Sequence, residues 1–491
     1  MRRLVTPFVA IAAILVAAAH PASAQSPREL IARAAQAMGG ADALHQIRSV
    51  SVEFSQLQYA LGQEETPYAP ARATMVFGRA VFDHAGSRRL QVSETRPAFV
   101  GGANTKQRVV YASGVVVTEN NGAAAPDVRG VALGAQSRLI RTQPERLVLS
   151  ALDNASALTA APARTWRNET LQGVHYVVGS DTLDLYFDGG TGLLALAVQM
   201  VDDAVLGDRA NVTSYQRWYA SGAVKLPRQI DITANDRPVQ QITVHAAEVN
   251  AALADSLFTA PADVALKSSR TVMPPEVIAL TLTDLTNGTW HLSGGNYNSL
   301  VVEQPAGLIV VEAPVSSARM RAVFDTLASR FPTKPVRLVV ATHHHYDHSG
   351  GVREVLARNV PLIVHERNGT FFVSVGKMKK SIAPDRLSSG GRFAVQTLRD
   401  TMTIGTGAGR VQLFAMPSVH VAGLLAAYVP ASQVLFTSDV VNPQPLPATL
   451  PPAGSKELVA FGEQRALIIK SYAGGHGRVV GWDELQRAAR P

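Results

Sequence analysis

The chain has 491 residues, a formal net charge of +8 at pH 7 and no cysteine, which excludes disulfides and thiolate metal ligands. Its length exceeds that of most single domains, so we expect two domains. Basic residues are scattered and aromatic residues make up only 6% of the chain, so no nucleic-acid partner is expected.

The first 24 residues have the features of a secretory signal peptide. Two arginines precede an apolar run at Leu4–Ala19, and Ala22-Ser23-Ala24 forms a small-residue cleavage pattern. A membrane anchor is the alternative, but Thr6 and Pro7 interrupt the run, which is shorter than the ~20 residues that span a bilayer. We therefore expect a periplasmic or secreted protein, with no transmembrane segment after signal cleavage.

Residues 25–264 have the pattern of an antiparallel β domain. One amphipathic helix is expected at 27–40, and the segments after it alternate polar and apolar residues with a period of two. The turn residues of DGGTG at Asp188–Gly192 predict a hairpin, and QIDITAND followed by QQITVHAAEV predicts another. The clearest strand segments lie at 49–59, 73–83, 107–119, 182–198, 229–236 and 240–249.

After a predicted linker at 265–275, the pattern changes to alternating strands and helices. The apolar segment LIVVEAP at 308–314 predicts a buried strand, and SSARMRAVFDTLASRF at 316–331 predicts a helix capped by Ser316. Another strand follows at 336–342, and a helix is expected from about Gly350. Residues 276–491 are therefore expected to form an α/β domain. Within it, KMKK at Lys377–Lys380 is interpreted as a solvated loop.

The stretch ATHHHYDHSGG at Ala341–Gly351 places four histidines and an aspartate between that strand and that helix. Strand ends are where α/β sheets present their ligand-binding loops. Because residues two apart in an extended chain point the same way, His343 and His345 can reach one metal ion. Asp347 and His348 then turn toward a second. Nitrogen and oxygen ligands of this kind suit zinc.

This stretch resembles the His-x-His-x-Asp-His signature of the metallo-β-lactamase superfamily. Further similar positions follow in order, with His420 in MPSVHVAGLL, Asp439 in VLFTSDVV and His476 in AGGHG. The resemblance implies a four-layered αββα sandwich at the C-terminus and two zinc ions per chain. It implies a first zinc bound by His343, His345 and His420, a second bound by Asp347, His348 and His476, and Asp439 as the bridge.

A di-zinc site of this kind implies a hydrolase. Water shared by two zinc ions loses a proton near neutral pH, so a metal-bridging hydroxide is available as the nucleophile. Asp347 has a second oxygen able to orient the hydroxide and to pass a proton to the leaving group. We expect an exported di-zinc metallohydrolase that cleaves a carbonyl ester, lactone, thioester or β-lactam bond of a small molecule. A phosphodiesterase using the same metal site is the alternative.

Two departures from the superfamily's patterns bear on the substrate. Familiar metallo-β-lactamases carry a cysteine or a serine where this chain has Asp439, so a dedicated β-lactamase is not favoured. Glu312-Ala313-Pro314 stands where many relatives carry an aspartate and a glycine after the apolar strand. The resemblance therefore indicates the type of reaction better than the substrate.

The first domain has a weaker resemblance. The segments VTSYQRWYASGAVKLPRQIDI at 212–232 and VNAALADSLFTAPA at 249–262 are similar to the closing strands of lipoprotein-carrier-like domains. Such domains wrap a half-open antiparallel sheet around acyl chains. Alternatively, this is a structural β domain that packs beside the active site and limits access to it. A second function therefore stays open, in which the chain is a non-catalytic periplasmic carrier of apolar ligands.

Overall fold

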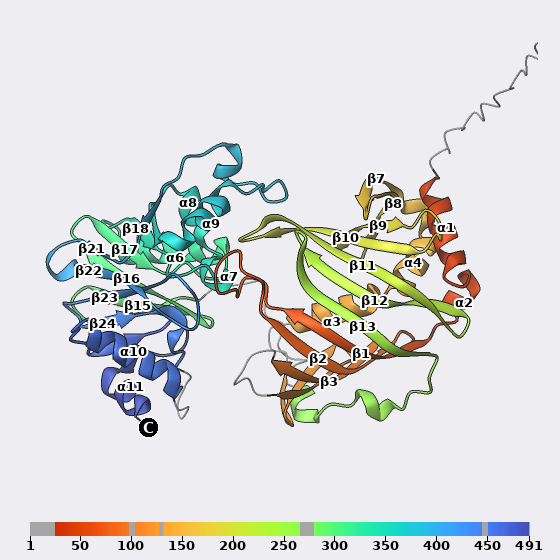
Figure 1. The fold of residues 1–491 in the computed structure, drawn as a ribbon, viewed down its shortest axis with the longest axis horizontal. Coiled ribbons are helices and arrows are strands. Elements are labelled where there is room, and N and C mark those ends of the chain that lie inside the picture. The colour runs from red at the N-terminus through yellow and green to blue at the C-terminus, as the bar shows by residue number, and fades with distance from the viewer. Residues whose placement is uncertain (1–24, 98–103, 127–130, 266–278, 444–449, 491) are drawn as a thin grey trace, which may run out of the picture.

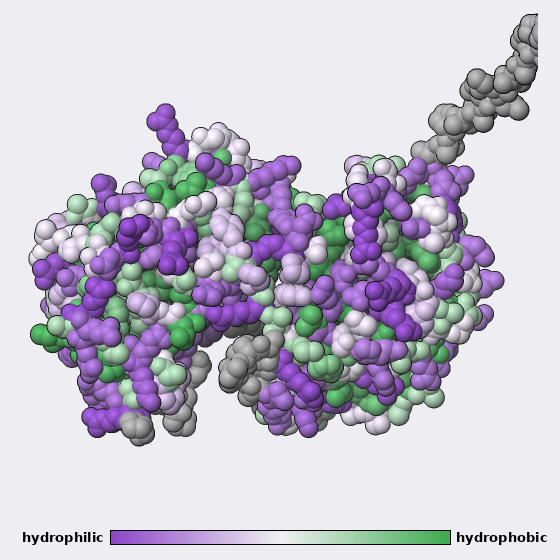
Figure 2. Space-filling view, viewed as in Figure 1, coloured by the Kyte–Doolittle hydropathy of each residue, from purple (hydrophilic) through white to green (hydrophobic). Residues whose placement is uncertain are grey.

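The computed structural model describes residues 25–97, 104–126, 131–265, 279–443 and 450–490, which fold into two domains (Figure 1). The predicted signal peptide at 1–24 and all of the predicted linker except Ala265 lie outside the described residues. Polar side chains cover most of the face seen in Figure 2, with hydrophobic residues scattered among them. Among the described residues, no helix is both long and apolar enough to cross a membrane.

The first domain is built on one antiparallel sheet of 13 strands, in the order β6-β5-β4-β3-β2-β1-β13-β12-β11-β10-β9-β8-β7. The strands are β1 (Ser49–Tyr59), β2 (Ala73–Asp83), β3 (Arg88–Pro97), β4 (Thr105–Ala112), β5 (Val115–Asn120), β6 (Ala123–Pro126), β7 (Thr159–Trp166), β8 (Glu169–Val178), β9 (Asp181–Phe187), β10 (Leu194–Asp203), β11 (Gly207–Ser221), β12 (Val224–Ala234) and β13 (Arg237–Val249). Both predicted hairpins are confirmed, since β9 pairs with β10 and β12 with β13. In the second hairpin, Asn235 and Asp236 both have positive φ, as a type I′ turn requires.

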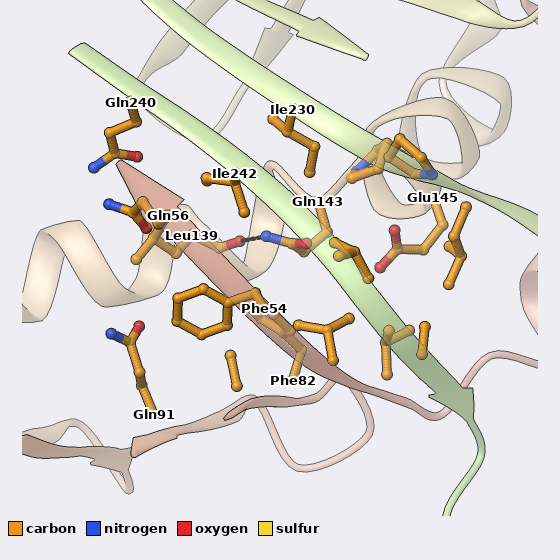
Figure 3. A pocket seen from close by; sticks show the side chains of 18 of the residues that line it. Phe54, Gln56, Phe82, Gln91, Leu139, Gln143, Glu145, Ile230, Gln240 and Ile242 are labelled. Carbon is orange, nitrogen blue, oxygen red and sulfur yellow. Dashed lines mark hydrogen bonds between the residues drawn. The ribbon is translucent and has the colours of Figure 1, made fainter. Parts of the chain in front are cut away.

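The first domain also contains the helices α1 (Pro27–Ala37), α2 (Ala41–His45), α3 (Val131–Arg141) and α4 (Pro144–Asp153). Helix α1 confirms the helix predicted near the start of the domain, and a capping box between Ser26 and Glu29 begins it. The sheet curves around α3 and α4 (Figure 1). A cavity of about 250 Å³ lies between them and the strands, and its lining includes Phe54, Phe82 and Ile242 (Figure 3).

The second domain has the four predicted layers, with helices outside two packed sheets. The first sheet contains β14 (Thr281–Asp284), β15 (Thr289–Gly294), β16 (Tyr297–Gln304), β17 (Gly307–Val311), β18 (Val336–Val340), β19 (Leu362–His365) and β20 (Val395–Leu398), in that order. The second contains β21 (Thr401–Ile404), β22 (Val411–Met416), β23 (Leu424–Val429), β24 (Val434–Phe436), β25 (Ser471–Ala473) and β26 (Val480–Gly481). The helices of this domain are α6 (Ser317–Arg330), α7 (Tyr346–Ser349), α8 (Val352–Ala357), α9 (Glu366–Lys377), α10 (Pro452–Gln464) and α11 (Trp482–Ala489).

Strand β17 shows how these layers are held together. Leu308 and Val310 belong to the core shared with α6, α8 and α9, whereas Ile309 and Val311 belong to the core between the two sheets. Successive side chains of a strand point to opposite faces, so this apolar strand is buried on both sides. Helix α6 follows directly after Ser316, whose side chain accepts a hydrogen bond from a backbone N–H in the first turn, which confirms the predicted cap.

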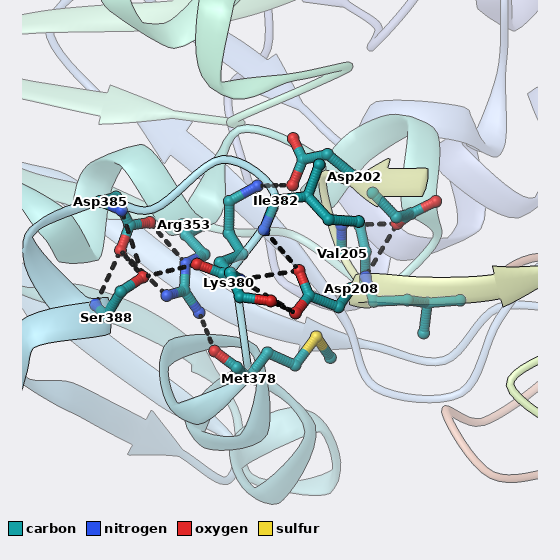
Figure 4. A network of polar contacts seen from close by, with 12 residues as sticks. Asp202, Val205, Asp208, Arg353, Met378, Lys380, Ile382, Asp385 and Ser388 are labelled. Carbon is teal, nitrogen blue, oxygen red and sulfur yellow. Dashed lines mark hydrogen bonds and ion pairs between the residues drawn. The ribbon is translucent and has the colours of Figure 1, made fainter. Parts of the chain in front are cut away.

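The tip of the β10–β11 hairpin joins the two domains. Val205, at this tip, is buried and belongs to the core of α6, α8 and α9 in the second domain. Asp208 accepts hydrogen bonds from the backbone N–H groups of Ser381 and Ile382 (Figure 4). Lys380 is buried and pairs with Asp202, so the interpretation of KMKK as a solvated loop is wrong at this residue. A contact with the other domain removes it from solvent.

Candidate metal centre

Four strands end at the candidate metal centre, and the segments after β18, β22, β24 and β25 carry all seven predicted ligands. Residues 341–345, which follow β18, belong to neither a helix nor a strand. Asp347 and His348 lie on the single-turn helix α7, so the expectation of an extended stretch is wrong for these two residues. A helical turn, and not strand alternation, therefore separates them from His343 and His345.

The predicted ligands form two groups in which the ligand atoms lie within 4.8 Å of one another. Asp439 belongs to both groups. The first group consists of His343, His345, His420 and Asp439, and the second consists of Asp347, His348, Asp439 and His476. The structure thus brings together the same sets of side chains as the sequence interpretation, while their role as metal ligands stays a prediction.

The first group presents nitrogen atoms that make no hydrogen bond within the described part of the chain. Nε2 of His343, Nδ1 of His345 and Nε2 of His420 are buried and have no hydrogen-bond partner among the described residues. The other ring nitrogens of two of them are held, because Nδ1 of His343 lies 3.0 Å from the Thr342 hydroxyl and Nε2 of His345 lies 2.9 Å from the carbonyl oxygen of Glu64. These contacts fix which nitrogen faces the group, as in zinc sites.

Burial also keeps these rings neutral. It lowers the pKa of His345 to about 4, and it lowers the pKa of His343 well below its ordinary value. The pKa of His420 is lowered for the same reason. Three neutral imidazoles with free lone pairs and one shared carboxylate are a ligand set that fits zinc.

The second group is rich in negative charge. Nε2 of His348 lies 3.0 Å from Oδ2 of Asp439 and 3.3 Å from Oδ2 of Asp347, and it lies 3.1 Å from Nε2 of His476. Burial alone would lower the pKa of His348, but the hydrogen bonds and charges of the two aspartates raise it well above its ordinary value. Ligand atoms this close need a positive charge among them, and a divalent cation fits that need.

Residues 292–487 match the family model described as the metallo-beta-lactamase superfamily. This part of the chain belongs to that superfamily. The match covers nearly all of the second domain and includes the seven candidate ligands of the metallo-beta-lactamase domain.

Two curated relatives match part of the chain. The 2,4-dinitroanisole O-demethylase subunit alpha of Nocardioides sp. (strain JS1661) is 24% identical over 164 residues, which are 33% of this chain and 47% of that protein. The linear primary-alkylsulfatase of Pseudomonas sp is 35% identical over 78 residues, which are 15% of this chain and 11% of that protein. The chain therefore spans less than half the length of either relative.

Solved structures also match part of the chain. A metallo-beta-lactamase from Pontibacter korlensis is 18% identical, with a TM-score of 0.35, over 43% of this chain and 97% of that one. The metallo-beta-lactamase FIM-1 from Pseudomonas aeruginosa, solved in a mono-zinc form, is 16% identical, with a TM-score of 0.34, over 44% of this chain and 95% of that one.

Glu312 lies behind the candidate metal ligands of the second domain. Its side chain is fully buried, accepts a 2.8 Å hydrogen bond from the Thr342 hydroxyl, and lies 3.8 Å from Nδ1 of His348. Burial raises the pKa of Glu312 to about 7. Its φ of +88° is rare for a residue with a side chain. In the sequence, Glu312 stands out only as a departure from the superfamily's pattern, and no role was predicted for it.

A loop of the first domain completes the surroundings of the centre, and the sequence interpretation missed it. The loop joins β1 to β2 and reaches α7 (Figure 1). Its Gln63 donates a 2.8 Å hydrogen bond to Oδ1 of Asp347, and its Glu64 carbonyl accepts from His345. Farther along it, Arg72 donates to the carbonyl oxygen of His420 over 3.1 Å. These partners are more than 280 residues apart, and no local pattern marks such contacts.

Two residues of the histidine motif point away from both groups. The ring of His344 is buried with its edge toward Phe371, at 5.8 Å between centroids, and burial lowers its pKa to about 3. The ring of Tyr346 stacks on that of Phe371, at 6.2 Å between centroids, and its hydroxyl accepts a hydrogen bond from Arg237 of the first domain. Their contacts are those of packed neighbours.

Proposed function

We propose that the chain is an exported di-zinc metallohydrolase that cleaves a carbonyl ester, lactone, thioester or β-lactam bond of a small molecule. One observation carries the proposal, namely the two adjacent groups of ligand atoms that share Asp439. The buried nitrogens of His343, His345 and His420 that lack a hydrogen-bond partner among the described residues support it, because such atoms are costly unless a cation binds them. The superfamily of the second domain supports the hydrolytic chemistry.

The residues of the centre have separate tasks in this reaction. The three neutral histidines of the first group offer lone pairs without adding charge, and Asp439 offers a carboxylate to both groups, which offsets the repulsion between two cations. Two zinc ions held there would lower the pKa of a water molecule and polarise the scissile carbonyl. Asp347 is the carboxylate available to take a proton from the attacking water and return it to the leaving group.

The test uses zinc-loaded protein without residues 1–24 and a panel of possible substrates. The panel contains a lactone, a thioester, a chromogenic cephalosporin and a phosphodiester. A linear primary alkyl sulfate and 2,4-dinitroanisole complete it, because the names of the two curated relatives refer to these compounds. We expect turnover of a carbonyl substrate that is lost in the His343→Ala variant. Turnover of the phosphodiester, the sulfate or the ether alone would contradict the carbonyl assignment.

The cavity of the first domain supports a second candidate function, the binding of an apolar ligand. Its lining is largely apolar (Figure 3), and Arg89 lines it as a buried cation whose pKa burial lowers to about 10. A fluorescent fatty acid is the probe for this function, because its chain suits the apolar wall and its carboxylate suits Arg89. We expect Ile230→Trp to fill the cavity and weaken binding, and His343→Ala to leave binding unchanged. Equal binding by both variants and the wild type would contradict this function.

A further inference from the structure

We propose that Gln63, which belongs to the first domain, is a positioning residue of the metal centre in the second. Its task is to hold the carboxylate of Asp347 so that one oxygen faces the second group of ligands. This inference rests on the proposed function, because it assigns a residue to the same site.

The contacts of Asp347 divide between its two oxygens. Oδ1 accepts the 2.8 Å hydrogen bond from the side-chain amide of Gln63. Oδ2 lies 3.3 Å from Nε2 of His348 and 3.9 Å from Nε2 of His476, within the second group. A donor on one oxygen thus fixes the rotation that leaves the other oxygen free to bind a cation. Residues that hydrogen-bond to a ligand without binding the metal themselves orient the ligands in many metal sites.

Without this donor, Asp347 has freedom to turn. Its side chain is 29% exposed, whereas that of His348 is fully buried, so Asp347 borders solvent. Water would then compete for the carboxylate and allow it to rotate away from the second group. The amide of Gln63 prevents this without adding a charge beside the ligands, as an arginine or a lysine would.

Gln63 is itself held in place by its neighbours in the loop. The carbonyl oxygen of Gly62 accepts a 3.1 Å hydrogen bond from the backbone N–H of Tyr346 in α7. Gly62 has a φ of +85°, and a Cβ there would lie 2.3 Å from the ring of Tyr346, so only glycine fits.

The residues after Gln63 connect the loop to the segments that follow β18 and β22. The carboxylate of Glu64 is fully buried and pairs with Arg237, which also donates to the hydroxyl of Tyr346 over 3.0 Å. The carbonyl oxygen of Glu65 accepts a 2.9 Å hydrogen bond from the backbone N–H of Ala422, two residues after His420. The loop is therefore held against two of the four ligand-bearing segments, those after β18 and β22, and Gln63 has a defined position.

The experiment compares three variants of the full protein without residues 1–24. Gln63→Leu removes the donor at similar size, and Gln63→Glu keeps the shape but offers only acceptors near neutral pH. Glu65→Gln is the matched control, because the Glu65 side chain is exposed and the contact with Ala422 uses its backbone. Zinc affinity is measured by competition with a chromogenic chelator, together with kcat, KM and the thermal midpoint.

We expect both Gln63 variants to bind the weaker of two zinc ions about 10- to 100-fold less tightly, with the tighter ion little affected. At zinc saturation, kcat falls and KM stays near its wild-type value, since Gln63 acts through Asp347. Glu65→Gln should behave as wild type, and all thermal midpoints of the metal-free proteins should agree. Wild-type zinc affinity and kcat in Gln63→Leu would overturn the inference.

The outcomes also separate this inference from the proposed function. A wild-type protein that binds two zinc ions but hydrolyses no substrate would refute the proposed function, while the zinc affinities would still decide the role of Gln63. A wild-type protein that binds no zinc would refute both. An active wild type with unchanged Gln63 variants would refute the role of Gln63 alone.

Discussion

The two groups of ligand atoms share Asp439 but differ in their electrostatics. In the first group, burial lowers the pKa of each histidine, so the rings are neutral. In the second group, two aspartates surround His348 and raise its pKa well above the ordinary value. The two groups therefore lie side by side in one domain but differ in charge. The first group would hold a cation by directed nitrogen lone pairs, and the second would hold one by negative charge.

The sharpest test of this comparison is removal of the residue that the groups share. We expect about two equivalents of zinc in the wild type and about one in His345→Ala, because only the first group loses a ligand. Asp439→Ala should weaken zinc binding at both groups and reduce turnover by more than roughly a thousandfold. This is more than the loss expected when a residue that only hydrogen-bonds to a ligand is removed. Metal analysis and kcat measure these changes. A single equivalent of zinc per chain in the zinc-loaded wild type would show that the two groups do not each bind an ion.

The next largest effect is expected at Asp347. The Asp347→Asn variant is nearly isosteric, but its amide cannot accept and return a proton. On a substrate with a poor leaving group, we expect kcat to fall at least roughly a hundredfold even at zinc saturation, with little change in the thermal midpoint. If added zinc restored the full rate, Asp347 would be a ligand only, and the proton transfer would belong to another residue.

A smaller effect concerns pH. Protonated His348 cannot bind a metal ion, so zinc affinity at the second group should fall as the pH drops below the raised pKa of His348, by about tenfold per pH unit. The first group should show little change between about pH 6 and 8, because the pKa of His345 is already lowered to about 4. In the metal-free protein, protonation of His348 stabilises the fold, and this contribution is lost as the pH rises through the raised pKa.

Chelator competition at several pH values measures both affinities. The His348→Ala variant is the control, since it should lose the pH-dependent step together with the second ion. Two binding steps with equal dependence on pH would show that the electrostatic difference between the groups does not govern metal binding.

Local sequence patterns predicted much of the architecture. Alternation with a period of two identified the strands of the first domain, and Ser316 marked the start of α6. The seven candidate ligands also came from the sequence, because the motif at His343–His348 and the resemblance to a known superfamily placed them in order. The chemistry of such residues is specific enough to stand out in one chain.

Contacts between the domains could not be predicted in the same way. Gln63 and the carbonyl of Glu64 meet residues more than 280 positions away, and neither a glutamine nor a backbone carbonyl has a distinctive pattern. Lys380 belongs to a basic run typical of solvated loops, yet Asp202 of the other domain buries it. Helix α7 was missed because a single turn is too short to show a helical period.

The position of Val205 has a consequence for the order in which the chain folds. This side chain belongs to the first domain, yet it fills part of the core beneath α6, α8 and α9. The hairpin that carries it precedes every strand of the second domain in the chain, and the N-terminal domain of a chain generally folds first. We therefore expect the second domain to assemble around Val205 after the first domain has folded, so that the first domain acts as an intramolecular template for the second.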